Sequence, residues 1–225
     1  MLLTDTVVIL PTYNEAENLR ILLPQLKQYN IDILVVDDSP ELETAEVAID
    51  SGVKVIRRNS KAGRTSAILD GIAATQHPKI ITMDADLQHP AEVIPNVLTA
   101  LNSHDIVVAS RKVGQGGYAH FPLRRRLISS TASLLALPLV PHLKDRTSGF
   151  VAFKRSVLNG AKLPLGFSTL TLSIFIFGKY NTFIEVPYTF QERQNGTSKL
   201  KVSTIFNHLG QLGKLYLYKI QRSIK

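Results

Sequence analysis

Three residues with side-chain oxygens recur at every second position of the stretch "KIITMDADLQH": Asp84, Asp86 and Gln88. In an extended chain, alternate side chains share a face, so these three would point the same way off the end of a strand. Such oxygens suit a hard cation such as Mg²⁺ or Mn²⁺, which is commonly held by one or two carboxylates plus substrate phosphates. An isolated Asp-x-Asp is also typical of a polar turn that caps a helix, so other parts of the chain have to decide.

The elements that must position these residues alternate along the chain. Short runs rich in β-branched residues predict strands at 6–12, 31–38, 53–58, 79–84 and 105–110. Helical patterns lie between them at about 14–26, 63–75 and 91–101. Asn14 and Glu17 resemble a capping box at the start of the first helix, and Pro24 is expected to kink it or end it early. Strands that alternate with helices predict an α/β fold, with a doubly wound, mostly parallel sheet.

In such a sheet, ligands bind at the carboxyl ends of the strands. The first predicted strand ends in "PTYNE", the second in Asp37 and Asp38, and the fourth in "DAD". These clusters should therefore line one crevice. The chain contains neither G-x-G-x-x-G after the first strand nor a Walker lysine motif, which argues against a dinucleotide dehydrogenase and a P-loop NTPase. A nucleotide crevice with a metal-holding carboxylate pair remains.

Charge is segregated along the 225 residues. Residues 1–105 hold 15 Asp and Glu against 8 Lys and Arg, whereas residues 106–225 hold 3 against 18. A basic surface attracts phosphate carried by a nucleotide, a nucleic acid or an anionic lipid. A non-catalytic protein that binds anionic ligands would explain the basic half but not the metal-type triad, and the aromatic–basic interleaving of single-strand binders is missing, so we expect no nucleic-acid partner.

The composition sets further limits. There is no Cys, hence no disulfide and no thiolate nucleophile or metal ligand. The longest uncharged runs, 127–143 and 163–178, contain Pro and are shorter than the roughly 20 residues that span a bilayer. We therefore expect no transmembrane helix, and we expect no signal peptide because the sequence runs straight into the first predicted strand.

Several motifs occur together, in order and at plausible spacing: "ILPTYNEAENL", "VVDDS", "ITMDADLQHP", "SRKVGQGG", "RRRLIS", "DRTSGFVAFKRSVL" and "EVPYTFQERQNGTSKL". Through them the chain resembles the family-2 glycosyltransferases of GT-A fold, of the dolichyl-phosphate mannose synthase type, over about residues 6–201. The resemblance implies a catalytic domain at 1–200, with a donor half at about 1–110 and an acceptor half at about 111–200. It also implies a nucleotide-sugar donor and a polyprenyl (dolichyl) phosphate acceptor.

The resemblance assigns roles to residues of this chain. The metal ligands would be Asp84, Asp86 and Gln88, for Mg²⁺ or Mn²⁺. The donor-binding residues would be Pro11, Tyr13, Glu15, Asp37, Asp38, Asp84, Ala85, Asp86, Gln88 and Arg193. The acceptor phosphate would be held by Arg111, Arg125, Arg126, Arg193 and Lys199. The catalytic residues would be Asp86, Arg111 and Arg125, although a register shift to Arg124 or Arg126 and a solvated surface role for these arginines both stay open.

The implied reaction is the inverting, metal-dependent transfer of a hexose, with mannose from GDP-mannose as the leading donor. A phosphate acceptor is mostly ionised at neutral pH, since its second pKa is about 6, and it needs no general base. His89 is accordingly read as a turn residue. A relative that uses UDP-glucose is the alternative, as is one that uses a soluble or polysaccharide acceptor with Asp145 as a candidate base.

Some stretches depart from the family pattern. "SPELETAEVA" follows Asp38, "AGRTSA" replaces a Gly-Leu-Gly-like turn, and the predicted helix at 168–179 lacks a carboxylate often present there. These changes fall near the expected donor base and sugar positions, and they leave the identity of the sugar open.

The segment 201–225 predicts a basic amphipathic helix with an apolar stripe. Its members are Val202, Ile205, Phe206, Leu209, Leu212 and Leu215. Such a helix is consistent with an anionic membrane surface, which would place the protein peripherally on the cytoplasmic face of a membrane. The alternative is that the stripe packs on the domain, and the sequence leaves the oligomeric state open.

Overall fold

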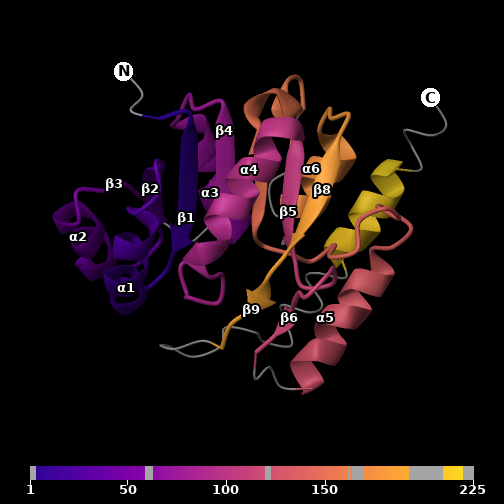
Figure 1. The fold of residues 1–225 in the computed structure, drawn as a ribbon, viewed down its shortest axis with the longest axis horizontal. Helices are drawn as coiled ribbons and strands as arrows, with labels where there is room; N and C mark the ends of the chain where they lie inside the picture. The colour runs from indigo at the N-terminus through magenta and orange to yellow at the C-terminus, as the bar shows by residue number, and fades with distance from the viewer. Residues whose placement is uncertain are drawn as a thin grey trace.

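A seven-stranded sheet forms the centre of the protein in the computed structural model, which describes residues 4–58, 63–119, 123–161, 163, 170–192 and 210–219 (Figure 1). The strand order is β3-β2-β1-β4-β7-β5-β8. The strands are β1 (Thr6–Thr12), β2 (Asp32–Asp37), β3 (Lys54–Arg57), β4 (Lys79–Thr82), β5 (Ile106–Ser110), β7 (Val151–Lys154) and β8 (Phe183–Pro187). This confirms the predicted α/β class and the mostly parallel sheet.

One strand breaks the parallel pattern. β7 lies between β4 and β5 and runs antiparallel to both. The strands β1 to β4 pair in parallel, as do β5 and β8. No strand was predicted at Val151–Lys154, because a run of four residues carries no clear periodicity.

Alternate residues of the strands feed two hydrophobic cores, one on each face of the sheet. Val8, Leu10 and Val35 face α1 (Ala16–Leu26), α2 (Glu43–Asp50), and α4 (Ile94–Ser103), which a 3₁₀ turn at Ala91–Val93 precedes. On the opposite face, Ile9 and Val36 pack against α3 (Arg64–Ala73), while α6 (Leu170–Phe177) covers the β5–β7 side. A second 3₁₀ turn, Arg155–Leu158, follows β7.

α3 approaches β1 closely because a helical glycine faces the strand. A Cβ built on Gly71 would lie 2.7 Å from Ile9 Cγ2 and 3.1 Å from Val36 Cγ2. This contact sets the height of α3 above the sheet, and thereby the place of its first residue, Arg64.

The first helix differs from its predicted details. α1 begins at Ala16 after Glu15, and it has no side-chain capping hydrogen bond, so the Asn14–Glu17 capping box was wrong. Asn14 instead takes a left-handed backbone conformation, with φ of 56°. Pro24 lies inside the helix, which ends two residues later at Leu26.

Three elements lie beyond the sheet. β6 (Gly117–Tyr118) pairs with β9 (Thr189–Phe190) in a small ribbon, into which β8 runs below the sheet (Figure 1). α5 (Leu123–Leu135) lies beside the helical residues 210–219. The Tyr216 hydroxyl donates to the Leu135 carbonyl at 2.5 Å, and Lys219 Nζ donates to the Leu139 carbonyl at 2.9 Å.

The helical residues 210–219 pack on the domain through part of the predicted stripe. Leu212 and Leu215 are buried against the α3–α6 face. Val202, Ile205, Phe206 and Leu209 lie outside the described residues. In the part of the chain that the structure describes, every helix is too short or too polar to cross a membrane.

Candidate active site

The polar ends of three neighbouring strands lie at one edge of the sheet. β1 pairs with β2 in a register that sets Thr12 beside Asp37, and β4 pairs with β1 on its other side. After β1 the chain adds β2 and β3 on one side of β1, and it then crosses back to add β4 on the other side. This reversal of strand order is the place at which open α/β sheets bind ligands.

The loop after β1 is tied to the end of β2 and the start of α2. The backbone N–H of Asn14 donates to Ser39 Oγ at 2.7 Å, and that of Glu15 donates to Thr44 Oγ1 at 3.2 Å. The Glu15 carboxylate is buried and accepts a hydrogen bond from Asn18 Nδ2 at 2.6 Å. Pro11 and Tyr13, also predicted to contact the donor, are half-buried at the same edge.

Asp37 is fully buried at the floor of this edge. Its Oδ1 accepts hydrogen bonds from Thr12 Oγ1 at 2.9 Å and Ser39 Oγ at 2.5 Å. Its Oδ2 has no hydrogen-bond partner among the described residues, and Arg57 Nε lies 4.0 Å away. A buried acceptor atom without a donor is uncommon and is expected to serve a bound group.

Asp38, in contrast, is already paired. Both its carboxylate oxygens accept hydrogen bonds from Arg58, which reaches Asp70 Oδ2 at 2.8 Å with its other terminal nitrogen. The hydrogen bonds that Arg58 donates to Asp38 raise the pKa of Arg58. The Asp38 side chain is therefore held in place at this edge of the sheet, and the nucleobase of a sugar donor bound there would contact the Asp38–Arg58 ion pair.

The stretch from Asp84 to Gln88 does not continue the strand, so the argument from alternate faces was wrong. β4 ends at Thr82, and Leu87 has φ of 63°. Asp84 remains partly exposed with 33% of its side-chain surface accessible, whereas Asp86 and Gln88 are buried. Asp86 Oδ1 accepts the Gln88 N–H at 3.3 Å, as in an Asx turn. A turn, not an extended chain, brings these oxygens to the edge, with Ala85 buried beneath them.

Gln88 is held from the other half of the chain. Its Nε2 donates to the Gln191 carbonyl at 3.1 Å, and the Gln191 N–H donates to the Gln88 carbonyl at 3.0 Å. Because the amide nitrogen is used in this way, the amide oxygen is the atom suited to a cation.

His89 is a structural part of the turn. Its Nδ1 accepts the Asp84 N–H at 2.9 Å, which places the ring proton of the neutral form on Nε2. The ring packs against Phe150, Tyr188 and Phe190, with centroids 5.4 to 5.8 Å apart. Burial lowers the pKa of His89 to about 4. A buried imidazole with this pKa and an occupied Nδ1 is poorly suited to general-base catalysis at neutral pH.

Arg64, the first residue of α3, joins Asp84 to the loop before β7. Its Nε donates to Asp84 Oδ1, and its Nη2 donates to the Gly149 carbonyl at 2.7 Å. The segment "AGRTSA" departs from the family pattern, but nothing in the sequence connects Arg64 with Asp84. The contact joins residues 20 apart in the chain and depends on how α3 packs.

The donor set at this edge fits a hard divalent cation. It combines two carboxylates, Asp84 and Asp86, with the amide oxygen of Gln88, while the nearby His89 Nδ1 is occupied by the Asp84 N–H. The described residues contain no group of three or more acidic or His side chains placed to hold a metal by themselves.

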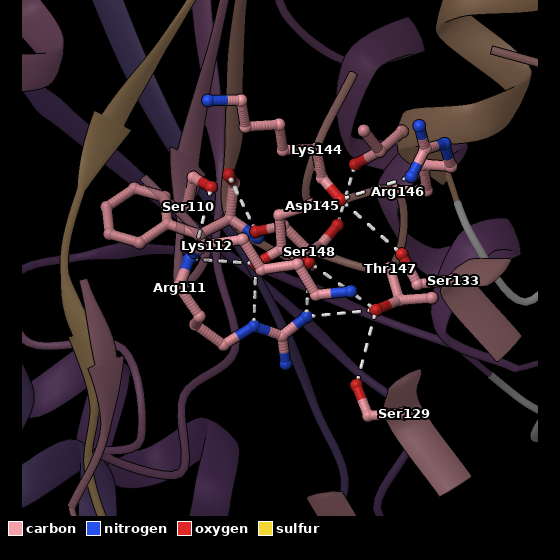
Figure 2. Close-up of polar contacts among 12 residues, drawn as sticks. Ser110, Arg111, Lys112, Ser129, Ser133, Lys144, Asp145, Arg146, Thr147 and Ser148 are labelled. Carbon is pink, nitrogen blue, oxygen red and sulfur yellow. Dashed lines mark hydrogen bonds and ion pairs between the residues drawn. The ribbon is translucent and has the colours of Figure 1, made fainter. Parts of the chain in front are cut away.

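On the other side of the edge, Arg111 follows β5 and is clamped by a buried carboxylate (Figure 2). Its Nε donates to Asp145 Oδ2 at 2.7 Å, its Nη2 to Asp145 Oδ1 at 2.6 Å, and its backbone N–H to Oδ2 at 2.8 Å. Thr147 Oγ1 accepts a further bond from Nη2 at 3.0 Å. The guanidinium also lies over the rings of Tyr118 and Phe190, 5.2 and 5.5 Å from their centroids.

The clamp fixes the charge of both partners. Burial alone would lower the pKa of Arg111, but the hydrogen bond and charge of Asp145 outweigh it and raise the pKa above its ordinary value. Burial alone would raise the pKa of Asp145, but Arg111 holds it below its ordinary value. Glu185 on β8 accepts the N–H groups of Lys144 and Asp145 at 2.7 and 2.9 Å and so anchors the loop. A carboxylate held in this way is a poor general base.

The remaining predicted residues are less well placed. Arg125 and Arg126 lie in the first part of α5, where the structure describes the backbone but not their side chains. Arg193 and Lys199 lie outside the described residues. Sequence reasoning missed the Asp145 clamp as well as Arg64. Asp145, which opens the "DRTSGF" motif, was predicted only as a candidate base.

The family described as "Glycosyl transferase family 2" matches residues 7–160. The chain is 42% identical to the "Dolichol-phosphate mannosyltransferase" of Pyrococcus furiosus, over 97% of its own length and 66% of that protein, just under two thirds. It is 34% identical to the protein of the same name from Mycosarcoma maydis, over 94% of the chain and 79% of that protein.

Two solved structures share the fold. One is glucosyl-3-phosphoglycerate synthase from Mycobacterium tuberculosis with Mn²⁺, UDP and glucosyl-3-phosphoglycerate, at a TM-score of 0.69 and 17% identity, covering 95% of this chain and 78% of that one. The other is mannosyltransferase PcManGT from Pyrobaculum calidifontis with GDP-Man and Mn²⁺, at a TM-score of 0.63 and 15% identity, covering 96% and 64%. At these identities the likeness concerns the GT-A fold alone.

Proposed function

The chain belongs to glycosyl transferase family 2, and on that premise we propose that it transfers mannose from GDP-mannose to a polyprenyl phosphate. The names of its relatives support the sugar and the lipid phosphate, and the GDP-Man complex of a protein with the same fold supports the donor. One observation of the site carries the proposal. Arg111 is a fixed cation, and the two candidate bases, His89 and Asp145, already accept hydrogen bonds from Asp84 and Arg111.

The donor nucleotide would bind where the strand order reverses. Pro11, Tyr13 and Glu15 line the β1 side of that edge, and Asp37 Oδ2, which accepts no hydrogen bond from the described residues, would accept one from the base or ribose. An acceptor buried as deeply as this one discriminates between ligands, because a ligand without a matching donor leaves it unpaired.

The diphosphate would lie over the turn after β4. Asp84, Asp86 and the Gln88 amide oxygen would hold Mg²⁺ or Mn²⁺ there. Such a cation, when bound, stabilises the negative charge that grows on the leaving diphosphate. The turn itself keeps these oxygens oriented through the His89 and Gln191 contacts.

The acceptor phosphate would bind at Arg111. The Asp145 clamp uses Nε and Nη2 of the guanidinium (Figure 2), so Nη1 is the nitrogen that would donate to the phosphate. Arg125 and Arg126 on α5, with Arg193 and Lys199, would supply further positive charge. These residues would offset the repulsion between two phosphate-bearing substrates.

The chemistry then needs no general base. An ionised phosphate oxygen attacks the anomeric carbon of the donor sugar. A new C–O bond forms as the bond to the diphosphate breaks, GDP leaves, and the anomeric carbon is inverted. The state of the site agrees, since His89 is neutral with Nδ1 occupied and Asp145 is bound to Arg111. Residues 1–110 would hold the donor and residues 111–200 the acceptor.

The lipid would reach the site from an anionic membrane surface on the cytoplasmic side, with the protein bound peripherally. Exposed apolar side chains gather on α5, on the residues after it, and on the helical residues 210–219: Leu134, Leu135, Leu137, Leu217 and Tyr218. Lys214 is exposed on the same helical segment. Apolar burial in the interface and basic side chains near anionic lipid both favour such binding.

A donor panel tests the proposal. The purified protein is incubated with a polyprenyl phosphate, Mn²⁺ and one radiolabelled donor: GDP-mannose, GDP-glucose, UDP-glucose or UDP-mannose. We expect lipid-extractable label from GDP-mannose, at a rate at least about tenfold above the others, which is about 1.4 kcal/mol of discrimination. Preference for UDP-glucose would overturn the donor assignment.

A further inference from the structure

Arg64 has no role in the proposed reaction, yet it contacts a residue that does. Its guanidinium lies between Asp84, a proposed metal ligand, and the loop that carries Asp145 and Gly149. The Arg64 side chain is 28% exposed and that of Asp84 is 33% exposed. The two side chains are thus partly exposed at the site and do not belong to the core.

The fold makes room for this guanidinium. A Cβ built on Gly149 would lie 2.9 Å from Arg64 Nη2 and 3.3 Å from His89 Cε1. The glycine of "TSGF" therefore leaves the space that the Arg64 fork fills, and its carbonyl accepts the second bond. With Nε on Asp84 and Nη2 on Gly149, the guanidinium has two anchors at once.

The contact places a positive charge on an oxygen that a metal ion would need. A divalent cation held by Asp84 would lie close to the Arg64 guanidinium, because Arg64 Nε already donates to Asp84 Oδ1. Like charges at such a distance repel strongly, even with partial solvent screening. Arg64 and the metal ion therefore compete for Asp84 as long as no other anion is present.

We propose that Arg64 holds Asp84 until the donor arrives, and that this makes metal binding depend on the nucleotide diphosphate. The diphosphate offers Arg64 a second anion next to Asp84, so the guanidinium moves to the phosphates and frees the carboxylate. The inference rests on the proposed function, because it assumes that Asp84 is a metal ligand and that the diphosphate binds beside it.

Mn²⁺ binding measured by electron paramagnetic resonance tests this without any turnover. The signal of free Mn²⁺ is titrated with protein, with and without saturating GDP, for the wild type and three variants. Arg64→Gln removes the charge but keeps an amide donor for Gly149. Arg64→Lys keeps the charge. Arg20→Leu is the matched control, since it removes one exposed positive charge on α1 that pairs with the exposed carboxylates of Glu17 and Glu43 and makes no contact with Asp84.

Without GDP, Arg64→Gln should bind Mn²⁺ about tenfold more tightly than the wild type. Arg64→Lys and Arg20→Leu should stay within about threefold of the wild type. With GDP the advantage of Arg64→Gln should shrink below about threefold, since the wild-type guanidinium then has the diphosphate as its partner. Thermal unfolding of each variant shows that folded protein is compared.

Two results would overturn the inference, and they can be told apart. If Arg64→Gln and the wild type bind Mn²⁺ equally without GDP while GDP still promotes binding, Arg64 does not compete for Asp84 and the inference is wrong. If no form binds Mn²⁺ even with GDP, the proposed metal site itself is wrong, and the inference is overturned with it.

Discussion

Replacing Asp145 with Asn should destabilise the protein strongly. Asn keeps the shape of the side chain but removes the negative charge that balances Arg111, whose side chain is 8% exposed while that of Asp145 is fully buried. Arg111 would then remain buried as an uncompensated cation. Removing one partner of a buried ion pair costs about 3–5 kcal/mol, and three hydrogen bonds join these two residues.

The assay is reversible denaturation in urea at pH 7. We expect the free energy of unfolding of Asp145→Asn to fall by about 3–5 kcal/mol. For a chain of 225 residues this corresponds to a melting temperature lower by roughly 6–20 °C. The double variant Arg111→Met/Asp145→Asn should recover part of the loss, because it no longer buries a lone charge. Met is of similar length and keeps the contact with the rings of Tyr118 and Phe190.

The pH dependence gives a second readout. Because the pKa of Asp145 is lower in the folded protein than its ordinary value of 3.8, the pair stabilises the fold above that value. The stabilisation is lost as the pH falls through the lower folded pKa, so the difference between wild type and Asp145→Asn should shrink at acid pH. A loss under about 1 kcal/mol at pH 7, or one that grows as the pH falls, would refute the reasoning.

Three further predictions concern the turn after β4 and the helical residues 210–219. Asp84→Asn and Asp86→Asn should each lower Mn²⁺-dependent transfer by about 10²-fold or more, measured with radiolabelled donor, and near-normal rates in either would exclude a role in metal binding. His89→Ala should keep transfer by the folded fraction within about tenfold, and a loss of three decades would reveal a missed base. Leu215→Asp should unfold the C-terminal helix, since Leu215 is buried, whereas Leu217→Asp, at a position 62% exposed, should leave the melting temperature unchanged and weaken pelleting with anionic liposomes. Equal liposome binding by Leu217→Asp and the wild type would count against a membrane contact there.

The fold of the first half could be predicted because its signals are local. The β-branched runs that form β1, β2 and β4 are buried on both faces, and such runs are typical of parallel strands. β7 could not be predicted, since its four residues become a strand only through antiparallel pairing with β4 and β5. That pairing depends on contacts distant in the sequence.

In the site, too, the features that follow from the strand order could be predicted, and those that depend on tertiary contacts could not. The strand order places the polar ends of β1, β2 and β4 together, as the carboxyl-end rule predicts. The geometry of the Asp84–Gln88 turn was not predictable by alternation, because Leu87 adopts a positive φ and reverses the chain. Arg64 and Asp145 depend on tertiary contacts with Asp84 and Arg111, which no pattern within one segment reports.

In the proposed reaction the acceptor is an ionised phosphate that fixed positive charge holds beside the donor. The most direct measurement compares a polyprenyl phosphate with the polyprenol of the same chain length, under the same GDP-mannose and Mn²⁺. We expect mannosyl lipid only from the phosphate, at a rate nearly constant from pH 7 to 8.5, where a phosphate of second pKa about 6 is already ionised. Transfer to the polyprenol at a comparable rate, or a rate that rises about tenfold per pH unit across this range, would show that a base activates the acceptor and would contradict the account.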